Sequence, residues 1–333
     1  MSAILEAFNL TKKFGNFEAV KGISFTVEEG EVFGLLGPNG AGKTTAISML
    51  TTVLKPTSGT ARIGGYDILK DPMRVKETIG LVPQDLALYP TLSARTNLNF
   101  FGSIYGLRGK QLAERVDDVL EVVALTDRQK DAVEKFSGGM KRRVNIAAGL
   151  VHHPRLLFLD EPTVGVDPQS RNHIFESVLK LNRERGMSII YTSHYMEEVE
   201  LLCNRVAIID QGVIIAMDTI KNLINMLGGG VIHVGLRQFN PALLDKIAGL
   251  RAVKTATILP PSAEKEAAGA ELLASAPAEA VTLVKVEALQ SQEALVNLIR
   301  FINEKDLAIA SMEILEPNLE SVFLHLTGKK LRE

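Results

Sequence analysis

The sequence between residues 32 and 45 reads VFGLLGPNGAGKTT. Its first part, Val32–Leu36, is a nearly continuous apolar run, which is typical of a strand buried on both faces of a parallel sheet. Its second part, Gly37–Thr45, matches the P-loop pattern GxxxxGK(S/T). A helical pattern continues over residues 44–54. A strand, a glycine-rich loop and a helix in this order predict an α/β fold with a site for phosphate groups.

The residue types of this loop suit a nucleotide. Glycines let the backbone wrap around phosphate groups, and the loop amides and the helix N-terminus direct partial positive charge at the anion. Lys43 is expected to reach the β- and γ-phosphates of ATP, and the hydroxyl of Thr44 to ligate Mg²⁺. The alternative is a glycine loop that matches by chance, which the flanking strand and helix disfavour. The expected nucleotide contacts are Gly37, Pro38, Asn39, Gly40, Ala41, Gly42, Lys43, Thr44 and Thr45.

A second apolar strand, Leu156–Leu159, ends in two carboxylates, Asp160 and Glu161. The carboxyl ends of parallel strands line the ligand crevice of a doubly wound sheet, so both side chains are expected beside the P-loop. Asp160 is placed to hold Mg²⁺ through water, and Glu161 is placed to polarise the attacking water as a general base. The alternative is a solvated Asp-Glu turn at the end of a strand, which the nearby phosphate loop disfavours.

Residues 1–227 are predicted to form one α/β domain. Near-continuous apolar or β-branched runs, such as Ser188–Thr192, alternate with helical patterns. Antiparallel hairpins are expected to turn at Glu28–Glu31 and at Asp210–Gly212. From about residue 85 to residue 135, apolar side chains recur at helical spacing, which predicts a helical insert.

A second domain is predicted over residues 228–333, because Gly228-Gly229-Gly230 cannot continue the preceding helix at low cost. Four strand patterns and two helix patterns follow in the order βαββαβ, which indicates a small α+β unit of the ferredoxin-like type. Residues 260–280 are rich in Pro, Ala and Glu and are expected to form a mobile loop. A last amphipathic helix is predicted over Leu319–Leu326. The strand patterns are Val231–Leu236, Val253–Leu259, Val281–Val286 and Leu307–Ile314, and the helix patterns are Pro241–Leu250 and Ser291–Asn303.

Composition narrows the class of protein. The chain has 333 residues with 37 basic and 39 acidic side chains, a balance that disfavours general nucleic-acid binding. A single cysteine, Cys203, excludes an intrachain disulfide and fits a reducing compartment. No apolar run approaches the roughly 18 residues that span a bilayer, and the N-terminus shows no signal-peptide pattern. The chain is therefore expected in the cytoplasm, where it would reach the inner face of the membrane only through a partner.

A further motif lies between the P-loop and the two carboxylates. Phe136–Met140 reads FSGGM, stands 20 residues before Asp160–Glu161, and resembles the LSGGQ signature of ATP-binding-cassette (ABC) ATPases. In the order of that family, Gln84 resembles the Q-loop glutamine, Val166–Asp167 resembles the end of the D-loop, and His194 resembles the switch histidine. The resemblance implies that the first domain is an ABC nucleotide-binding domain, which includes an antiparallel β subdomain and hydrolyses ATP with Mg²⁺.

The resemblance also implies roles for these residues. His194 would contact the γ-phosphate, and Gln84 would approach the metal and couple the nucleotide to a partner. The signature of one chain would cap the ATP held by a second copy, so the family implies a head-to-tail homodimer. Phe136 and Met140 depart from the usual leucine and glutamine. The residues that would contact this nucleotide are intact and comprise Ser137, Gly138, Gly139 and Asp167.

Two smaller assignments leave alternatives open. Phe14 resembles the aromatic residue that stacks on adenine in this family, but Phe8, Phe17 and Phe25 compete with it, and an aromatic side chain near a strand end often belongs to the core. The basic run Lys141–Arg143 could be taken for a nucleic-acid patch. Its place at the start of the signature helix favours a solvated or phosphate-facing surface.

The segments FSGGMKRR and EPTVGVDP, together with Glu316–Phe323, are similar to the drug-export branch of the family, which includes daunorubicin-resistance-type ATPase subunits. The resemblance implies an ATPase that powers a membrane exporter of drugs, lipids or other amphipathic cargo, with an integral membrane permease as partner. Apolar side chains in Leu86–Pro90 and Phe100–Tyr105 would form the docking groove for that permease or the core of the insert. Two alternatives are an importer ATPase with a regulatory C-terminal domain and a soluble ABC ATPase that acts on ribosomes or DNA.

Overall fold

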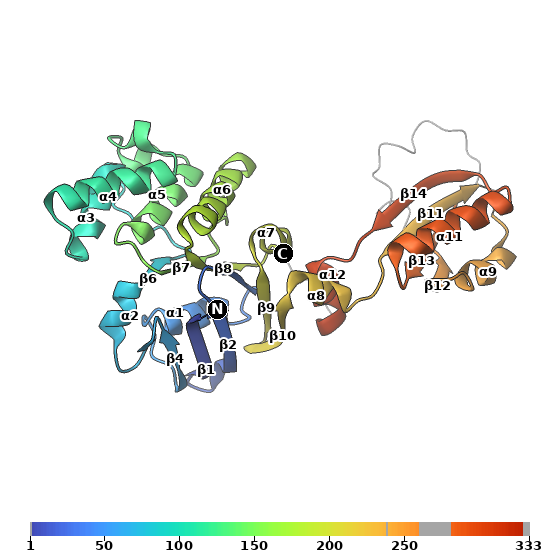
Figure 1. Ribbon diagram of the computed structural model, residues 1–333, viewed down its shortest axis with the longest axis horizontal. Coiled ribbons are helices and arrows are strands. Elements are labelled where there is room, and N and C mark those ends of the chain that lie inside the picture. Colours follow the sequence, from blue (N-terminus) through green and yellow to red (C-terminus); the bar gives the residue numbers. More distant parts are fainter. Residues whose placement is uncertain (1, 238, 260–280, 329–333) are drawn as a thin grey trace. The chain divides into compact units, whose positions relative to one another are not determined.

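A computed structural model describes residues 2–237, 239–259 and 281–328, and these fall into two units (Figure 1). The first unit ends at Ile220 and the second begins at Lys221. Within the described ranges, no helix is both long enough and apolar enough to cross a membrane. The segment 260–280, for which a mobile loop is predicted, lies outside the described residues.

The P-loop strand β3 (Val32–Leu36) lies inside a six-stranded sheet of the first unit. The other strands are β6 (Ile79–Val82), β7 (Leu156–Asp160), β8 (Ser188–Ser193), β9 (Arg205–Asp210) and β10 (Val213–Thr219). Their order is β10-β9-β3-β8-β7-β6, parallel throughout except for β10, which forms the predicted hairpin with β9. Every residue of β3, β7 and β8 is buried, as their near-continuous apolar runs predict.

A second, antiparallel sheet has the order β2-β1-β4-β5, which confirms the predicted antiparallel subdomain. Its strands are β1 (Ala3–Phe14), β2 (Phe17–Glu28), β4 (Ser58–Ile63) and β5 (Tyr66–Asp67). Side chains of both sheets share one hydrophobic core, in which the rings of Phe25 and Phe33 stack with centroids 5.4 Å apart.

The predicted hairpin at Glu28–Glu31 is wrong. The chain does turn there, with the N–H of Glu31 donating to the carbonyl of Glu28 at 3.2 Å, but β2 and β3 belong to different sheets. The reason is that β3 buries both faces, as a central strand of a parallel sheet does, and pairs with β8 and β9. Much of β2 instead alternates buried and exposed residues, and β2 pairs with β1. The hairpin of the antiparallel sheet instead joins β1 to β2, where Phe14 pairs with Phe17.

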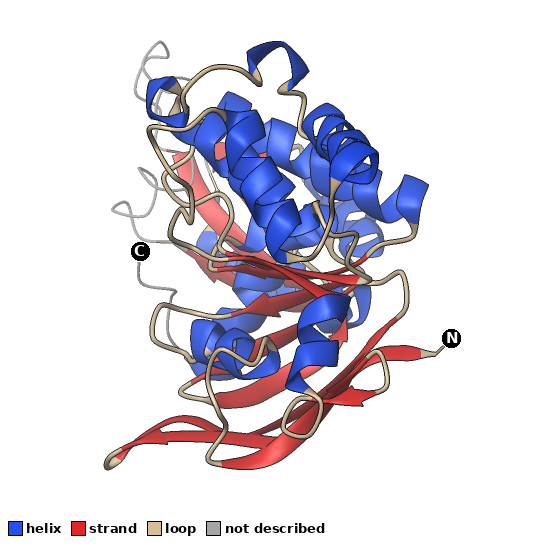
Figure 2. Cartoon of the chain, turned by 90° about the vertical axis from the view of Figure 1, so that its left-hand side faces the viewer, coloured by secondary structure: helices blue, strands red, loops and turns tan. Residues whose placement is uncertain are grey.

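Helices lie on both sides of the six-stranded sheet (Figures 1 and 2). On one side, α1 (Lys43–Leu50) contributes to the core shared by the two sheets. On the other side, α3 (Ala94–Ile104) and α4 (Gly109–Val122), from the predicted helical insert, pack on α5 (Gly138–Leu150). The remaining elements of the unit are α2 (Pro72–Thr78), α6 (Pro168–Arg185), α7 (Met196–Leu202) and the short turns η1 (Thr126–Arg128) and η2 (Val133–Lys135).

The second unit contains the predicted βαββαβ arrangement. Its four strands are antiparallel in the order β12-β13-β11-β14, which is the ferredoxin-like order. Apolar side chains of α9 (Leu244–Ala248) and α11 (Ser291–Glu304) pack on one face of this sheet. The elements are α8 (Ile220–Asn225), β11 (Val231–Arg237), η3 (Pro241–Leu243), α9 (Leu244–Ala248), β12 (Val253–Ile258), β13 (Val281–Ala288), α11 (Ser291–Glu304), β14 (Ile309–Leu315) and α12 (Leu319–Thr327).

The glycine run at residues 228–230 lies between α8 and β11, inside the second unit. A Cβ on Gly229 would lie 2.4 Å from the carbonyl oxygen of Ala288, and a Cβ on Gly230 would lie 2.5 Å from that of Leu315. The run therefore ends the preceding helix and also lets the backbone pack closely against the ends of β13 and β14.

Candidate active site

The P-loop connects β3 to α1, and glycine is required at two of its positions. Gly42, the residue before α1, has φ +106°, in the region that favours glycine. A Cβ on Gly37 would lie 2.2 Å from the carbonyl oxygen of Ile209, so no larger residue fits between the loop and β9. The predicted strand, loop and helix are all present, and Lys43 is the first residue of the helix.

Lys43 is only 4% exposed, which is rare for a lysine. Its Nζ donates to the carbonyl oxygen of Gly37 at 2.7 Å and to that of Pro38 at 3.2 Å. The same nitrogen lies 3.0 Å from Oε1 of Glu161. These acceptors compensate the buried charge and hold it beside the loop amides, where it can attract an anionic group.

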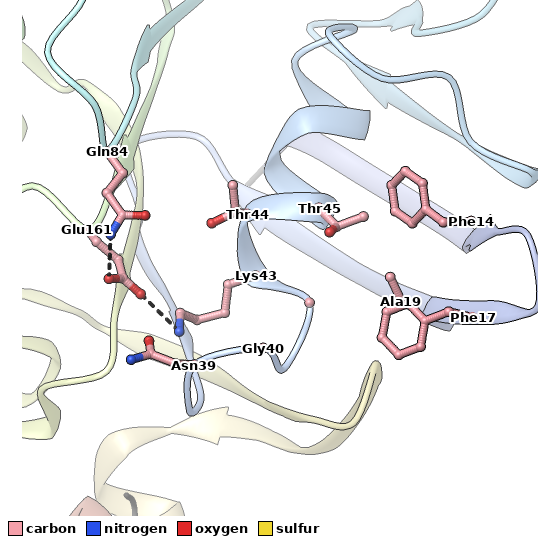
Figure 3. A pocket seen from close by; sticks show the side chains of 11 residues that line it. Phe14, Phe17, Ala19, Asn39, Gly40, Lys43, Thr44, Thr45, Gln84 and Glu161 are labelled. Carbon is pink, nitrogen blue, oxygen red and sulfur yellow. Dashed lines mark hydrogen bonds and ion pairs between the residues drawn. The ribbon is translucent and has the colours of Figure 1, made fainter. Parts of the chain in front are cut away.

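Side chains from three other segments converge on the carboxylate of Glu161. Figure 3 shows two of them, Lys43 and Gln84. Oε1 pairs with Lys43, while Oε2 accepts a hydrogen bond from Nε2 of Gln84 at 3.4 Å and lies 3.2 Å from Nδ1 of His194. Glu161 has φ +46°, and its N–H donates to Oγ1 of Thr192 at 2.8 Å, which helps to hold this uncommon backbone conformation. The structure thus brings together the four residues for which sequence analysis predicts catalytic roles.

Asp160 precedes Glu161 at the end of β7 and is 3% exposed. Its Oδ1 accepts a hydrogen bond from Oγ1 of Thr192 at 2.7 Å. Burial raises the pKa of the Asp160 carboxyl, and hydrogen bonds from Thr192 and Thr44 oppose this shift. Thr192 therefore contacts both acidic residues. The sequence patterns did not predict this role of Thr192, although a hydroxyl near the end of the neighbouring strand β8 could have indicated it.

A pocket of about 320 Å³ opens beside Lys43 (Figure 3). Two phenylalanines from the β1–β2 hairpin line it: Phe14 is 50% exposed and Phe17 is 65% exposed. Nζ of Lys12 lies 5.2 Å from the centre of the Phe14 ring. Both rings are therefore available to a planar ligand, and the choice of Phe14 stays a prediction. The pocket is lined by Phe14, Phe17, Ala19, Asn39, Gly40, Gly42, Lys43, Thr44, Thr45, Gln84 and Glu161.

The signature segment lies at the N-terminus of α5, next to the start of α6. Ser137 caps α5 by accepting a hydrogen bond from the N–H of Met140 at 3.2 Å, and Asp167 caps α6 by accepting one from the N–H of Ser170 at 2.9 Å. The hydrogen bond from Ser170 lowers the pKa of Asp167. A Cβ on Gly139 would lie 2.1 Å from the Ser170 side chain, so helix packing alone requires glycine there.

The structure does not place every predicted nucleotide contact at the pocket. The P-loop residues that do not line it lie elsewhere in the same loop, and the signature and D-loop residues lie at the two helix caps. In the described part of the chain, the predicted contacts absent from the pocket lining are Gly37, Pro38, Ala41, Ser137, Gly138, Gly139, Asp167 and His194.

The prediction that the basic run Lys141–Arg143 lies on a surface is wrong for Arg142. Arg142 is 5% exposed, and its Nη1 and Nη2 donate to the carbonyl oxygens of Pro83 at 2.8 Å and Gln84 at 2.6 Å. On the same helix, Oδ1 of Asn145 accepts the N–H of Ala87 at 3.2 Å. The signature helix therefore holds the segment around Gln84. The signal was that the second half of α5, Val144–Leu150, is mostly apolar, so much of this helix is buried and polar side chains within it are buried too.

Comparisons with known proteins extend over the whole chain. Residues 20–164 match the family described as ABC transporter. The chain is 46% identical to the linearmycin resistance ATP-binding protein LnrL of Bacillus subtilis (strain 168), with 99% of this chain and 100% of that protein covered. It is 37% identical to the daunorubicin resistance ATP-binding protein DrrA2 of Streptomyces coeruleorubidus, with 96% and 94% covered.

Two further comparisons bear on the activity. The chain is 37% identical to the Nod factor export ATP-binding protein I of Cupriavidus metallidurans (strain ATCC 43123 / DSM 2839 / NBRC 102507 / CH34), with 100% of both chains covered. Its fold is similar to that of the ATP-binding cassette MJ0796 in a dimeric post-hydrolysis state bound to ADP and Pi. The TM-score is 0.59 at 25% identity, with 65% of this chain and 98% of that chain covered.

Proposed function

The chain belongs to the ABC transporter family as an ATP-binding subunit, and we propose that it powers a membrane exporter by hydrolysing ATP at Glu161. One observation carries the catalytic assignment. Lys43, Gln84 and His194 come from three separate segments, and each contacts the carboxylate of Glu161 at the side of the pocket. A cation, a carboxylate and an imidazole held around one point suit phosphoryl transfer, which needs positioning and charge stabilisation.

Each of these side chains has a separate task in the proposal. Lys43 binds the β- and γ-phosphates and neutralises charge that develops on them. Glu161 orients the attacking water and polarises it as a general base. His194 contacts the γ-phosphate. Gln84 lies between the pocket and the helical insert, where it senses the nucleotide and passes its state to a partner.

The donor set beside the P-loop fits Mg²⁺. Thr44, Gln84 and Asp160 offer a hydroxyl, an amide oxygen and a carboxylate, which are the hard oxygen ligands that Mg²⁺ prefers. Burial raises the pKa of Asp160, and a cation beside it would favour its charged form. The described residues hold no cluster of three or more His, Cys, Asp or Glu that could bind a metal alone, which suits an ion shared with phosphate oxygens. When bound, Mg²⁺ would neutralise phosphate charge.

A homodimer completes the site in this proposal. Ser137 caps α5, a helix of 13 residues, and its N-terminus can bind an anion. The signature lies away from the pocket of its own chain, which suits a head-to-tail pair in which it covers the ATP of the partner. The similarity to a cassette solved as a dimer supports this arrangement.

The proposed permease docks on exposed aromatic and aliphatic side chains of the helical insert. Tyr89 and Phe100 are 46% and 42% exposed, and their rings meet edge to face with centroids 5.0 Å apart. They lie next to the segment held by Arg142, so a partner there would be close to Gln84. Such a surface can receive a helix of the permease at the inner face of the membrane. The patch comprises Leu86, Tyr89, Leu92, Phe100, Ile104 and Tyr105.

The cargo and the second domain complete the proposal. Relatives named for linearmycin resistance, daunorubicin resistance and Nod factor export support outward transport of an amphipathic compound. In the proposal, the unit that ends at Ile220 is the ATPase domain, and the unit that begins at Lys221 is an accessory domain.

Purification of the tagged full chain from gently solubilised membranes tests this proposal. A multi-span membrane protein is expected to co-purify in about equal amount, and Mg²⁺ chelation is expected to abolish ATP hydrolysis by the complex. Replacing Phe100 with Ser should release the membrane protein, while the same change at exposed Val53, outside the patch, should not. Ribosomal proteins or nucleic acid in place of a membrane protein would contradict the exporter assignment.

A further inference from the structure

A buried carboxylate lies close to His194 but outside the pocket. Glu198, in α7, is 3% exposed. Its Oε2 accepts hydrogen bonds from three hydroxyl groups, those of Thr163 at 2.8 Å, Tyr191 at 2.9 Å and Ser193 at 3.0 Å. Burial raises the pKa of Tyr191 well above its ordinary value, so this hydroxyl keeps its proton for the carboxylate.

The hydroxyl groups belong to segments that flank the proposed catalytic residues. Thr163 lies two positions after Glu161, in the turn that leads to α6. Ser193 directly precedes His194, and its Oγ also accepts the N–H of Tyr195 at 2.9 Å. One carboxylate oxygen therefore connects the turn after Glu161 to the loop that carries His194.

A cation from a further segment faces the other oxygen of this carboxylate. Nε of Arg171, in α6, lies 3.6 Å from Oε1 of Glu198, and neither atom has a hydrogen-bond partner within the described structure. The guanidinium also lies 5.3 Å from the centre of the Tyr195 ring. Glu198 is thus the common partner of α6, the turn after Glu161, β8 and the loop around His194.

Packing alone does not account for a carboxylate at this position. Val199 and Leu202 of the same helix are buried and apolar, so a leucine or methionine at residue 198 would fill the space without the penalty of burying a charge. A carboxylate adds directional hydrogen bonds, which fix the relative positions of the groups that donate them.

We propose that Glu198 is a positioning residue for ATP hydrolysis, which fixes His194 and the turn after Glu161 relative to each other. This inference rests on the proposed contact between His194 and the γ-phosphate. The contacts that the described structure gives for Glu198 include no P-loop residue and neither aromatic residue of the pocket. Loss of the carboxylate should therefore lower kcat and leave the KM for ATP nearly unchanged.

Steady-state hydrolysis of MgATP by the full chain tests this, with Glu198→Gln, His194→Ala and the double variant. Glu198→Gln keeps the size of the side chain but removes its charge and replaces one acceptor oxygen with an NH2 donor. Its kcat is expected to fall about 10- to 100-fold, the scale of a small misplacement of a catalytic group. In the His194→Ala background it should cause a much smaller further loss, because one of the two groups that it positions is gone. Glu197→Gln, an exposed neighbour on the same helix, is the matched control and should keep the wild-type kcat.

The outcomes separate this inference from the proposed function. If His194→Ala keeps the wild-type kcat, the role assigned to His194 is wrong and the inference fails with it. If His194→Ala is slow but Glu198→Gln is not, only the role of Glu198 is wrong. Losses that multiply in the double variant, or a KM that rises as kcat falls, would show a general structural role and also overturn the inference.

Two further variants apply if Glu198→Gln does not fold. Ser193→Ala and Thr163→Val each remove one hydroxyl donor and leave the carboxylate in place. Each is expected to lower kcat with little change in KM, and Ser193→Ala should have the larger effect because Ser193 is adjacent to His194. Wild-type kcat in both folded variants would contradict the proposal.

Discussion

The two units of the chain bury different kinds of side chain. The first buries charged groups, among them Lys43, Arg142, Glu161 and Glu198. In the described part of the second unit, none of the buried side chains is polar. Buried charge lowers stability unless partners compensate it, so an apolar core is the simpler way to hold a fold together. The difference fits the proposal that the chemistry belongs to the first unit.

Removal of the P-loop cation should give the largest change in activity. Lys43→Met is expected to lower ATP hydrolysis by about 10³-fold, because a neutral side chain cannot stabilise the phosphates and Glu161 loses its cation. Hydrolysis by the purified full chain measures this. Lys55→Met, at an exposed lysine, is the control and should match wild type. If Lys43→Met hydrolyses ATP at a rate within tenfold of wild type, the pocket beside Lys43 is not the site of hydrolysis.

Loss of the buried arginine in α5 should mainly change stability. Arg142→Met leaves the carbonyl oxygens of Pro83 and Gln84 without these donors, and the free energy of unfolding is expected to fall by about 2–4 kcal/mol. Urea denaturation measures the change. Lys141→Met, one residue earlier and less buried, should stay within about 0.5 kcal/mol of wild type. Equal stability of the two variants would show that Arg142 does not hold this segment.

The KM for ATP can show which of the two aromatic residues at the pocket, Phe14 or Phe17, stacks on the base. Phe14→Ala is expected to raise the KM for ATP about tenfold, since stacking on a base contributes about 1–3 kcal/mol. Phe17→Ala should raise it less. Steady-state kinetics at saturating Mg²⁺ gives both values. A larger effect at Phe17 would transfer the stacking role to that residue.

A change in the apolar core of the second unit should have the smallest effect. Ile302→Val removes one buried methylene group and is expected to cost about 0.5–1.5 kcal/mol of stability, with kcat unchanged. Denaturation and hydrolysis are measured on the same preparation. A tenfold loss of kcat in this folded variant would contradict the proposal that the chemistry belongs to the first unit.

Local patterns were sufficient for most of the fold. The runs at Val32–Leu36 and Leu156–Leu159 are apolar without interruption because both faces of these strands are buried, so their place in a parallel sheet could be predicted. The same logic predicted that Asp160 and Glu161 would lie beside the P-loop, as they do. The order of elements in the second unit was also enough to predict its ferredoxin-like sheet.

What local patterns missed depends on partners far away in the sequence. The residues at Glu28–Glu31 are typical of a hairpin turn, but the next strand, β3, pairs with β8 and β9. Arg142 belongs to a basic run, yet its acceptors lie almost 60 residues earlier, at Pro83 and Gln84. The acceptor role of Glu198 likewise depends on Thr163, 35 residues away. Sequence spacing does not encode such contacts.

In the first unit, the carboxylate of Glu161 and the side chains that contact it are proposed to catalyse ATP hydrolysis. Glu161→Gln tests this proposal most directly, because the variant keeps the shape of the site and removes the proposed general base. Its affinity for ATP should be retained in equilibrium binding, while single-turnover hydrolysis should slow by about 10²–10⁴-fold. Hydrolysis at the wild-type rate with unimpaired binding would contradict the account.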